Sequence, residues 1–310
     1  MPSPPWRPQR AAVVAQINAA RNDLGLAALR YDPLLERVGD AHCAILIEEG
    51  GDGHFSRSGV PPYLRWLLAG GNGFHVENVG SYSTTGRVVE PALGGILARS
   101  VSTMLEEVPP ADGHRRALLD PWVTHIGVGL AWGDGEVRMT HELATEVTEG
   151  WVPPPTVARP RTNVKLSGRL PRPWEAGALE MLWEKLPHPL TDAELRTIRS
   201  YSYPPRRAMV YANRPAGEPP APGTPTDREA RTTALPFAID RRGNFSFGWT
   251  TGPHEGVEIV LLWARHGAEQ PYVPVAASAT VVVETGQLPP ELAFWHRLGT
   301  GPETAPTGEP

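Results

Sequence analysis

The sequence has little cysteine, a modest charge and no long apolar run, and each scarcity excludes a class of site. Cys43 is the only cysteine in 310 residues, so the chain can form neither an internal disulfide nor a zinc site of several thiolates. Charged residues make up 20% of the chain and the formal net charge is −5, which argues against a nucleic-acid partner. No stretch reaches the roughly 18 apolar residues of a membrane span, so we expect no transmembrane segment.

The chain does contain enough apolar material for two folded domains. Hydrophobic residues make up 40% of a length that is about twice that of a usual domain. The 35 prolines and 32 glycines fall mostly in clusters. From these clusters we predict a first domain at 7–150, a Pro-rich linker at 151–162, a second domain at 163–286 and a loosely held Pro/Gly-rich tail at 287–310.

The first domain shows both helix and strand patterns. Apolar residues recur at helical spacing over residues 9–24 and 89–107, and again after Asp32 and Pro33, which favour the start of a helix. Residues 125–132 alternate large apolar residues with small ones and are followed by a second strand pattern at 137–143, which predicts a β-hairpin. The mixture predicts an α+β fold.

The second domain is predicted to be mainly β. Short strand patterns occur at 163–168, 178–183, 208–211, 234–239, 244–249, 257–263 and 277–284. Several short strands separated by turn residues are typical of a β-sandwich. One helix is expected over 190–200, where Thr191 and Glu194 can form a capping box, and a long exposed loop is expected over 214–225.

Histidines and acids gather at the predicted ends of elements in the first domain, where functional residues are disproportionately placed. The candidates are His54, His75, Glu77, Glu106, Glu107, Asp112 and His114. Two imidazoles and two carboxylates in one cleft could bind a divalent cation of the zinc type or hold a polarised water. The alternative is that they are polar residues satisfied at helix ends. The nearest potential nucleophiles are interpreted as turn or cap residues in the case of Ser56, Ser58 and Ser81, and as a helix-packing residue in the case of Cys43.

Five segments of the first domain form an ordered set of motifs, at residues 17–21, 24–35, 76–79, 113–121 and 124–129. Together they resemble the CAP superfamily of cysteine-rich secretory proteins, antigen 5 and pathogenesis-related proteins, in its cysteine-poor bacterial, SCP-like form. Val76-Glu-Asn-Val79 is similar to the family's G-E-N-[IV], with Val76 in place of the glycine. The resemblance extends to about residue 148 and implies an α-β-α sandwich with a central cleft.

The resemblance also implies which residues line that cleft. By matched position these are His54, Glu77, His114 and Glu107, with His54 and His114 as the metal ligands. Glu106 competes with Glu107 for the position of the second acid. An insertion precedes His114, so Asp112 could substitute for that acid, and His75 is expected at the mouth of the cleft.

Three functions are compatible with the sequence. The leading hypothesis is a secreted, non-enzymatic CAP protein that binds a divalent metal and a lipid, cell-envelope component or protein in the cleft. The alternatives are a metal-assisted hydrolase, such as a protease, and a structural envelope protein with a vestigial cleft. CAP proteins are usually exported, so we expect an extracellular or cell-surface location, and we interpret the lack of a leader at Met1 as the result of its removal.

Overall fold

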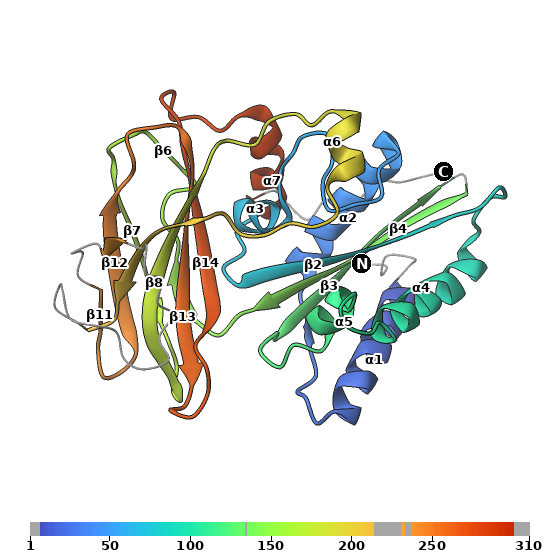
Figure 1. Cartoon of the computed structure of the whole chain (residues 1–310), viewed down its shortest axis with the longest axis horizontal. Helices are drawn as coiled ribbons and strands as arrows, with labels where there is room; N and C mark the ends of the chain where they lie inside the picture. Colours follow the sequence, from blue (N-terminus) through green and yellow to red (C-terminus); the bar gives the residue numbers. More distant parts are fainter. Residues whose placement is uncertain (1–6, 134, 214–230, 233–236, 301–310) are drawn as a thin grey trace.

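The computed structural model describes residues 7–133, 135–213, 231–232 and 237–300, and its fold is α+β, as predicted. Figure 1 shows two parts side by side: a helix-covered sheet built by the first half of the chain and a sandwich of strands built by the second half. Across the described residues, every helix is too short or too polar to cross a membrane.

The N-terminal half is a four-stranded sheet with helices on both faces. Its strand order is β1-β3-β4-β2, where β1 (Arg30–Tyr31) is parallel to β3 (His125–Gly133), and both β3 and β2 (Phe74–Ser83) are antiparallel to β4 (Glu136–Thr145). One face packs against α1 (Arg7–Asp23), α4 (Glu90–Leu105) and α5 (Gly113–Leu118). The other face packs against α2 (Pro33–Glu49) and α3 (Pro62–Leu68).

Local signals explain how α2 is placed. The Asp32 carboxylate accepts the first free backbone N–H groups of the helix at 2.6 and 3.0 Å, and Pro33 occupies the first helical position. At the other end Gly50 adopts a φ of 68°, a left-handed conformation that ends the helix. The helix approaches β3 closely because Gly39 faces Gly129, where an added Cβ would lie 2.4 Å from the Gly39 Cα.

The C-terminal half is a two-sheet sandwich. In the described ranges the larger sheet has the order β10-β9-β8-β13-β14-β6 and the smaller sheet the order β11-β12-β7-β5. The strands are β5 (Glu149–Val152), β6 (Val157–Ala158), β7 (Asn163–Arg169), β8 (Trp174–Glu184), β9 (Arg206–Tyr211), β10 (Arg231–Thr232), β11 (Ala238–Ile239), β12 (Asn244–Thr250), β13 (Gly256–His266) and β14 (Val273–Val282). An apolar core that includes Phe247 and Trp249 fills the space between the sheets.

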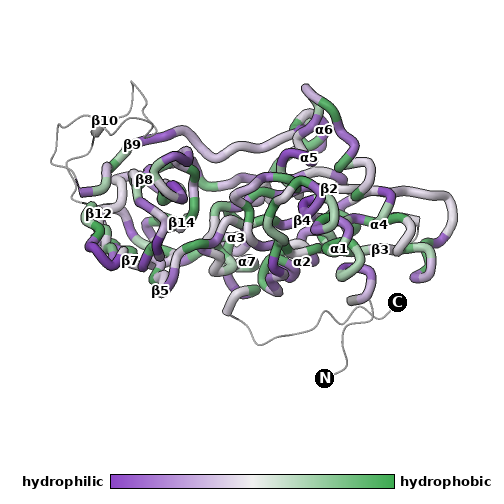
Figure 2. The backbone as a smooth tube through the Cα atoms, turned by 90° about the horizontal axis from the view of Figure 1, so that it is seen from below, coloured by the Kyte–Doolittle hydropathy of each residue, from purple (hydrophilic) through white to green (hydrophobic). Residues whose placement is uncertain are grey.

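The two halves share a second apolar core. It contains Trp66 of α3, Ile259 of β13, Val281 of β14 and Trp295 of α7 (Pro290–Thr300). Figure 2, which is turned by 90° from Figure 1, also shows α3 and α7 between β14 and α2. Because this core is built from both halves, separating them would expose large aromatic side chains to water.

The structure differs from the expected organisation at two Pro-rich segments. Residues 151–162, expected as a linker, contain the end of β5 and all of β6, because β6 pairs with β14 and Trp151 Nε1 donates to Ser278 Oγ at 3.1 Å. Residues 287–310, expected as a loose tail, contain α7, because Leu292 and Trp295 share one helix face that is buried against α3. The loop expected at 214–225 lies outside the described residues.

Candidate functional site

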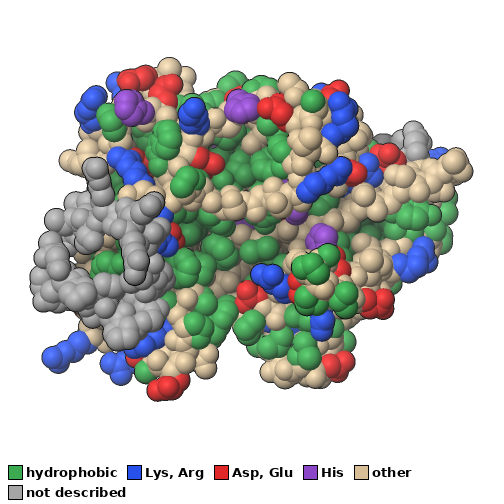
Figure 3. All heavy atoms as spheres, viewed as in Figure 1, with side chains coloured by type: hydrophobic (Ala, Val, Ile, Leu, Met, Phe, Trp, Pro, Cys, Tyr) green, Lys and Arg blue, Asp and Glu red, His purple; other side chains and the backbone are tan. Residues whose placement is uncertain are grey.

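A cavity of about 680 Å³ opens where β2, α5 and residues 199–203 meet. Residues 199–203, here called the strap, follow α6 (Asp192–Thr197), which lies over the N-terminal half, and lead back across β2 toward the sandwich, where β9 begins. The cavity wall includes His54, Phe74, Val76, Glu77, Glu107, His114, Tyr201 and Tyr203. Figure 3 shows imidazole groups beside the hollow on this face of the molecule. Apolar walls with a few polar groups are typical of a small-ligand site.

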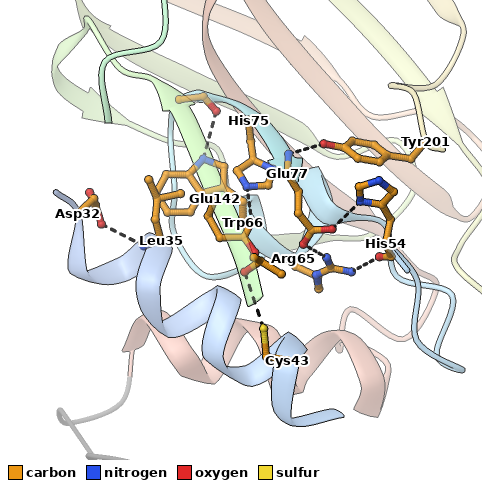
Figure 4. A network of polar contacts seen from close by, with 12 residues as sticks. Asp32, Leu35, Cys43, His54, Arg65, Trp66, His75, Glu77, Glu142 and Tyr201 are labelled. Carbon is orange, nitrogen blue, oxygen red and sulfur yellow. Dashed lines mark hydrogen bonds and ion pairs between the residues drawn. The ribbon is translucent and has the colours of Figure 1, made fainter. Parts of the chain in front are cut away.

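The His54 ring contacts the carboxylate of Glu77, which also accepts a hydrogen bond from the buried Arg65. His54 Nδ1 lies 2.9 Å from Glu77 Oε1, and Arg65 Nη2 donates to Glu77 Oε2 at 2.5 Å (Figure 4). Arg65 Nη1 also donates to the carbonyl oxygens of His54 and Val60, at 2.9 and 3.0 Å. Arg65 is fully buried, and its positive charge compensates that of Glu77. The position of His54 is therefore set through both its ring and its backbone.

Two strap tyrosines cover this part of β2. The Tyr201 hydroxyl accepts the backbone N–H of Glu77 at 2.5 Å, and the Tyr203 hydroxyl accepts that of His75 at 3.2 Å. The Tyr201 ring meets the His54 ring edge-on, with centroids 4.8 Å apart. Burial raises the pKa of both tyrosine hydroxyls well above the usual value, so both stay neutral. The second half of the chain thus supplies part of the cavity wall.

A second imidazole of the cavity wall, that of His114, is paired with a carboxylate at the start of α5. His114 Nδ1 lies 2.5 Å from Glu107 Oε1, and Glu107 Oε2 accepts the backbone N–H groups of His114 and Arg115 at 3.0 and 3.2 Å. Burial acts to raise the pKa of Glu107, but the hydrogen bonds from His114 and Arg115 outweigh it, and the pKa is lowered. An ionised Glu107 therefore both caps the helix and orients the His114 ring.

The two pairs have the same arrangement. In each, Nδ1 of the imidazole faces a carboxylate oxygen. A neutral ring whose Nδ1–H donates to a carboxylate carries its lone pair on Nε2. Both His54 and His114 can therefore present a basic nitrogen to a cation or to a proton donor.

The remaining predicted site residues have other roles. His75, expected at the mouth, also lines the cavity but is fully buried, with its Nε2 2.8 Å from Glu142 Oε2 and its ring stacked on Trp66. Burial lowers the pKa of His75 to about 3 and raises that of Glu142. Glu106 caps the C-terminus of α4 and Asp112 precedes α5; the cavity lining includes neither of them.

Sequence reasoning missed Arg65, Tyr201 and Tyr203. A signal for Arg65 did exist, because it is the only charge in the otherwise apolar helix Pro62–Leu68. The tyrosines gave no local signal, because they are 124 and 128 residues away in sequence from the N–H groups that they accept.

A complete metal cage is not present in the described ranges. There, no group of three or more His, Cys, Asp or Glu side chains is arranged so that it could hold a metal ion. Cys43 is buried and its thiol pKa is raised well above the usual value by that burial, so it is a poor metal ligand and a poor nucleophile. The zinc-type cofactor expected from the sequence would have to rely on the two cavity histidines.

No protein-family model and no curated protein matches the chain. Solved structures that resemble part of it include an outer surface protein from Borrelia burgdorferi, at 19% identity and a TM-score of 0.36 over 45% of this chain and 93% of that chain. An extracellular protein containing a SCP domain from Bacillus anthracis str. Ames is 18% identical, with a TM-score of 0.35 over 46% of this chain and 44% of that chain. NaASP2 with Zn²⁺ is 9% identical, with a TM-score of 0.33 over 44% of this chain and 79% of that chain. Likenesses at this level assign neither a family nor a function to the chain.

Proposed function

We propose that this chain is an extracellular, CAP-type binding protein whose cavity binds a divalent cation through His54 and His114, together with a ligand that has an apolar part. The proposal is carried by one observation: two imidazole–carboxylate pairs of the same arrangement line one cavity. The ordered motifs at residues 17–21, 24–35, 76–79, 113–121 and 124–129 support the CAP assignment and, with it, export.

The orientation of the rings suits a cation. Histidines that bind metals usually donate their second ring N–H to a carboxylate, which fixes the tautomer and makes the ligating nitrogen more basic. Two imidazoles would occupy two positions around a zinc ion and leave the others to water or to the ligand. When bound, the cation would supply positive charge that attracts an oxygen or nitrogen atom of the ligand.

The charge balance also favours a cation. Arg65 neutralises Glu77, so Glu107 is the carboxylate whose charge can offset that of a bound ion. His54 and His114 would bind the cation through unprotonated ring nitrogens, so protons would compete with the cation for these positions.

The cavity is also much larger than a metal ion. Phe74, Val76, Tyr201 and Tyr203 give it aromatic and aliphatic walls. A lipid or a cell-envelope molecule with a polar group at the histidines and an apolar part along these walls would use both features. Ser56, the nearest hydroxyl in the sequence, lies 2.9 Å from Ser58 Oγ in a turn, which favours binding over covalent catalysis.

Native mass spectrometry during a Zn²⁺ titration tests the proposal on wild type, His54→Ala, His114→Ala and His254→Ala. His254 is an exposed histidine of the sandwich and serves as the matched control. Wild type and His254→Ala should retain one zinc ion, and each cavity variant should lose it. A wild type that stays free of zinc, or cavity variants that bind it as well as the control does, would show that the proposal is wrong.

A further inference from the structure

Among the residues that the structure describes, the outer edge of β2 is covered along only part of its length. β2 pairs with β4 at every position of Phe74–Ser83 without a bulge. The N–H groups of His75 and Glu77 point away from β4, because they donate to the strap tyrosines. Backbone groups alternate in direction along an antiparallel strand. The N–H groups of Val79 and Ser81 therefore also point away from β4.

Residues 79–83 form an edge without the usual protection. Proteins protect exposed edge strands with charged side chains, proline, bulges or short length. This stretch reads Val-Gly-Ser-Tyr-Ser, and its last three residues are exposed. Figure 1 shows β2 running on past the strap at this end. The backbone at this edge is able to pair with a further strand.

A second cavity adjoins this stretch. It has a volume of about 430 Å³ and lies between β2, β4 and α4, with Tyr82, Leu97 and Met104 in its wall. It shares Glu107 and His114 with the first cavity, so the two form one groove beside β2. A chain lying along the edge could place an apolar side chain in this second cavity.

The exposed charged side chains along the groove are both arginines, whereas its two glutamates are less exposed. Arg199 lines the first cavity and Arg99 the second, and both residues are exposed. The carboxylates of Glu77 and Glu107 are instead engaged by Arg65 and His114. An occupant that carries Asp or Glu side chains would complement the two exposed arginines.

The strap shows what kind of occupant this edge accepts. It is itself a length of polypeptide that runs antiparallel to β2, with Tyr201 at Glu77 and Tyr203 at His75. Its hydroxyl groups take the place of the acceptors that a paired strand would supply. The uncovered stretch continues the same edge.

We propose that the β2 edge between Val79 and Ser83 binds an extended, acidic segment of a partner protein as an additional strand, with an apolar side chain in the second cavity. Main-chain hydrogen bonds would give the affinity, and the cavity and the arginines would select the sequence. This site uses the backbone of β2 and the α4 residues that line the second cavity. It can therefore be tested independently of cation binding at His54 and His114.

A library of random decapeptides displayed on phage is the probe, and fluorescence anisotropy of the enriched peptides gives the affinity. Ser81→Pro removes one outward N–H at an edge position where proline is tolerated, whereas Ser81→Ala keeps it and is the matched control. Enriched peptides should combine Asp or Glu with alternating apolar residues. Ser81→Pro should weaken their binding by about tenfold or more, and Ser81→Ala should leave it unchanged.

A second measurement does not depend on the fold of the proline variant. In wild type, adding an enriched peptide should slow amide hydrogen exchange at Val79 and Ser81. If the library yields no binders, or if they bind Ser81→Pro as tightly as wild type and leave these amides unprotected, the proposal is overturned. It is also overturned, in favour of a second copy of this chain, if sedimentation shows a wild-type dimer that Ser81→Pro separates into monomers.

Discussion

Both halves of the molecule bury glutamates, but they engage them with different donors. In the sandwich Glu258 accepts hydrogen bonds from Trp249 Nε1 at 2.8 Å, from the Gly252 N–H at 2.7 Å and from Arg207 Nη1 at 3.0 Å. None of these donors changes its charge near neutral pH. This cluster holds its charge over the physiological range and serves to tie strands together.

In the N-terminal half each of two buried glutamates faces an imidazole, and one of them, Glu77, also accepts from the guanidinium of Arg65. Glu77 faces His54 and Glu142 faces His75, in neighbouring strands of one sheet. An imidazole can gain or lose a proton in the physiological range, and the protein sets where it does so by burial. Burial lowers the pKa of His75 to about 3, so this ring stays neutral at physiological pH. Glu142 therefore faces a neutral ring, whereas Glu258 faces the charged guanidinium of Arg207.

The largest expected difference is in the free energy of unfolding, between substitution of a fully buried arginine and substitution of a half-exposed one. Arg65→Met would leave the fully buried Glu77 carboxylate without its compensating charge, and should lower the free energy of unfolding by about 3–5 kcal/mol. Arg207→Met should cost about 1 kcal/mol, because Arg207 is 47% exposed and Glu258 keeps its other two donors. Urea denaturation of both variants gives the two values, and equal losses would contradict the contrast between the halves.

The next effect is on pH dependence. Burial lowers the pKa of His42, His75 and His141, all in the N-terminal half, to about 3. The unfolded chain binds a proton at each below about pH 6.5, whereas the native chain does so only near pH 3, so these groups make stability fall as the pH drops through that window. His141→Gln should reduce this slope by up to about 1.4 kcal/mol per pH unit.

Unfolding free energies measured between pH 4 and 6.5 check this, with His254→Gln, a substitution of an exposed histidine, measured alongside as the control. Burial also raises the pKa of Asp40 and Glu146 to about 7. Each of these carboxyls keeps its proton in the native state above the pH at which the unfolded chain loses it, so their contribution to stability falls as the pH rises toward 7. For that reason the change of unfolding free energy with pH is compared between variants. If His141→Gln leaves this slope unchanged, the buried imidazole of His141 does not contribute to it.

The smallest effect tests whether the strap belongs to the site. Tyr201→Phe keeps the ring against His54 but removes the hydroxyl that accepts the Glu77 N–H, and should cost about 1 kcal/mol. Tyr82 lies at the exposed end of β2, the strand that contains Glu77, and Tyr82→Phe should leave the free energy of unfolding almost unchanged. Thermal unfolding of the two variants compares them directly. Similar losses would mean that the strap contributes no specific contact at the cavity.

The elements that depend on neighbours in sequence were predictable. The cap at Asp32 and Pro33 starts α2, and the capping box of Thr191 and Glu194 starts α6. In both cases the contacts lie within three residues of each other, so the pattern itself carries the information. Helix α7 was missed because the prolines and glycines around it outweighed the pair Leu292 and Trp295, whose burial depends on α3.

By itself the sequence determined the α+β class and the caps that start α2 and α6, and its resemblance to the CAP superfamily supplied the candidates His54, Glu77, Glu107 and His114. Only the tertiary structure decided that Arg65 compensates Glu77, that the strap forms a wall of the cavity, and that β2 is an edge strand of its sheet in the described part of the chain. The physical reason is the distance along the sequence over which the contacts act. Caps and periodicities act over a few residues, whereas these features arise from contacts and sheet positions that packing of the two halves creates.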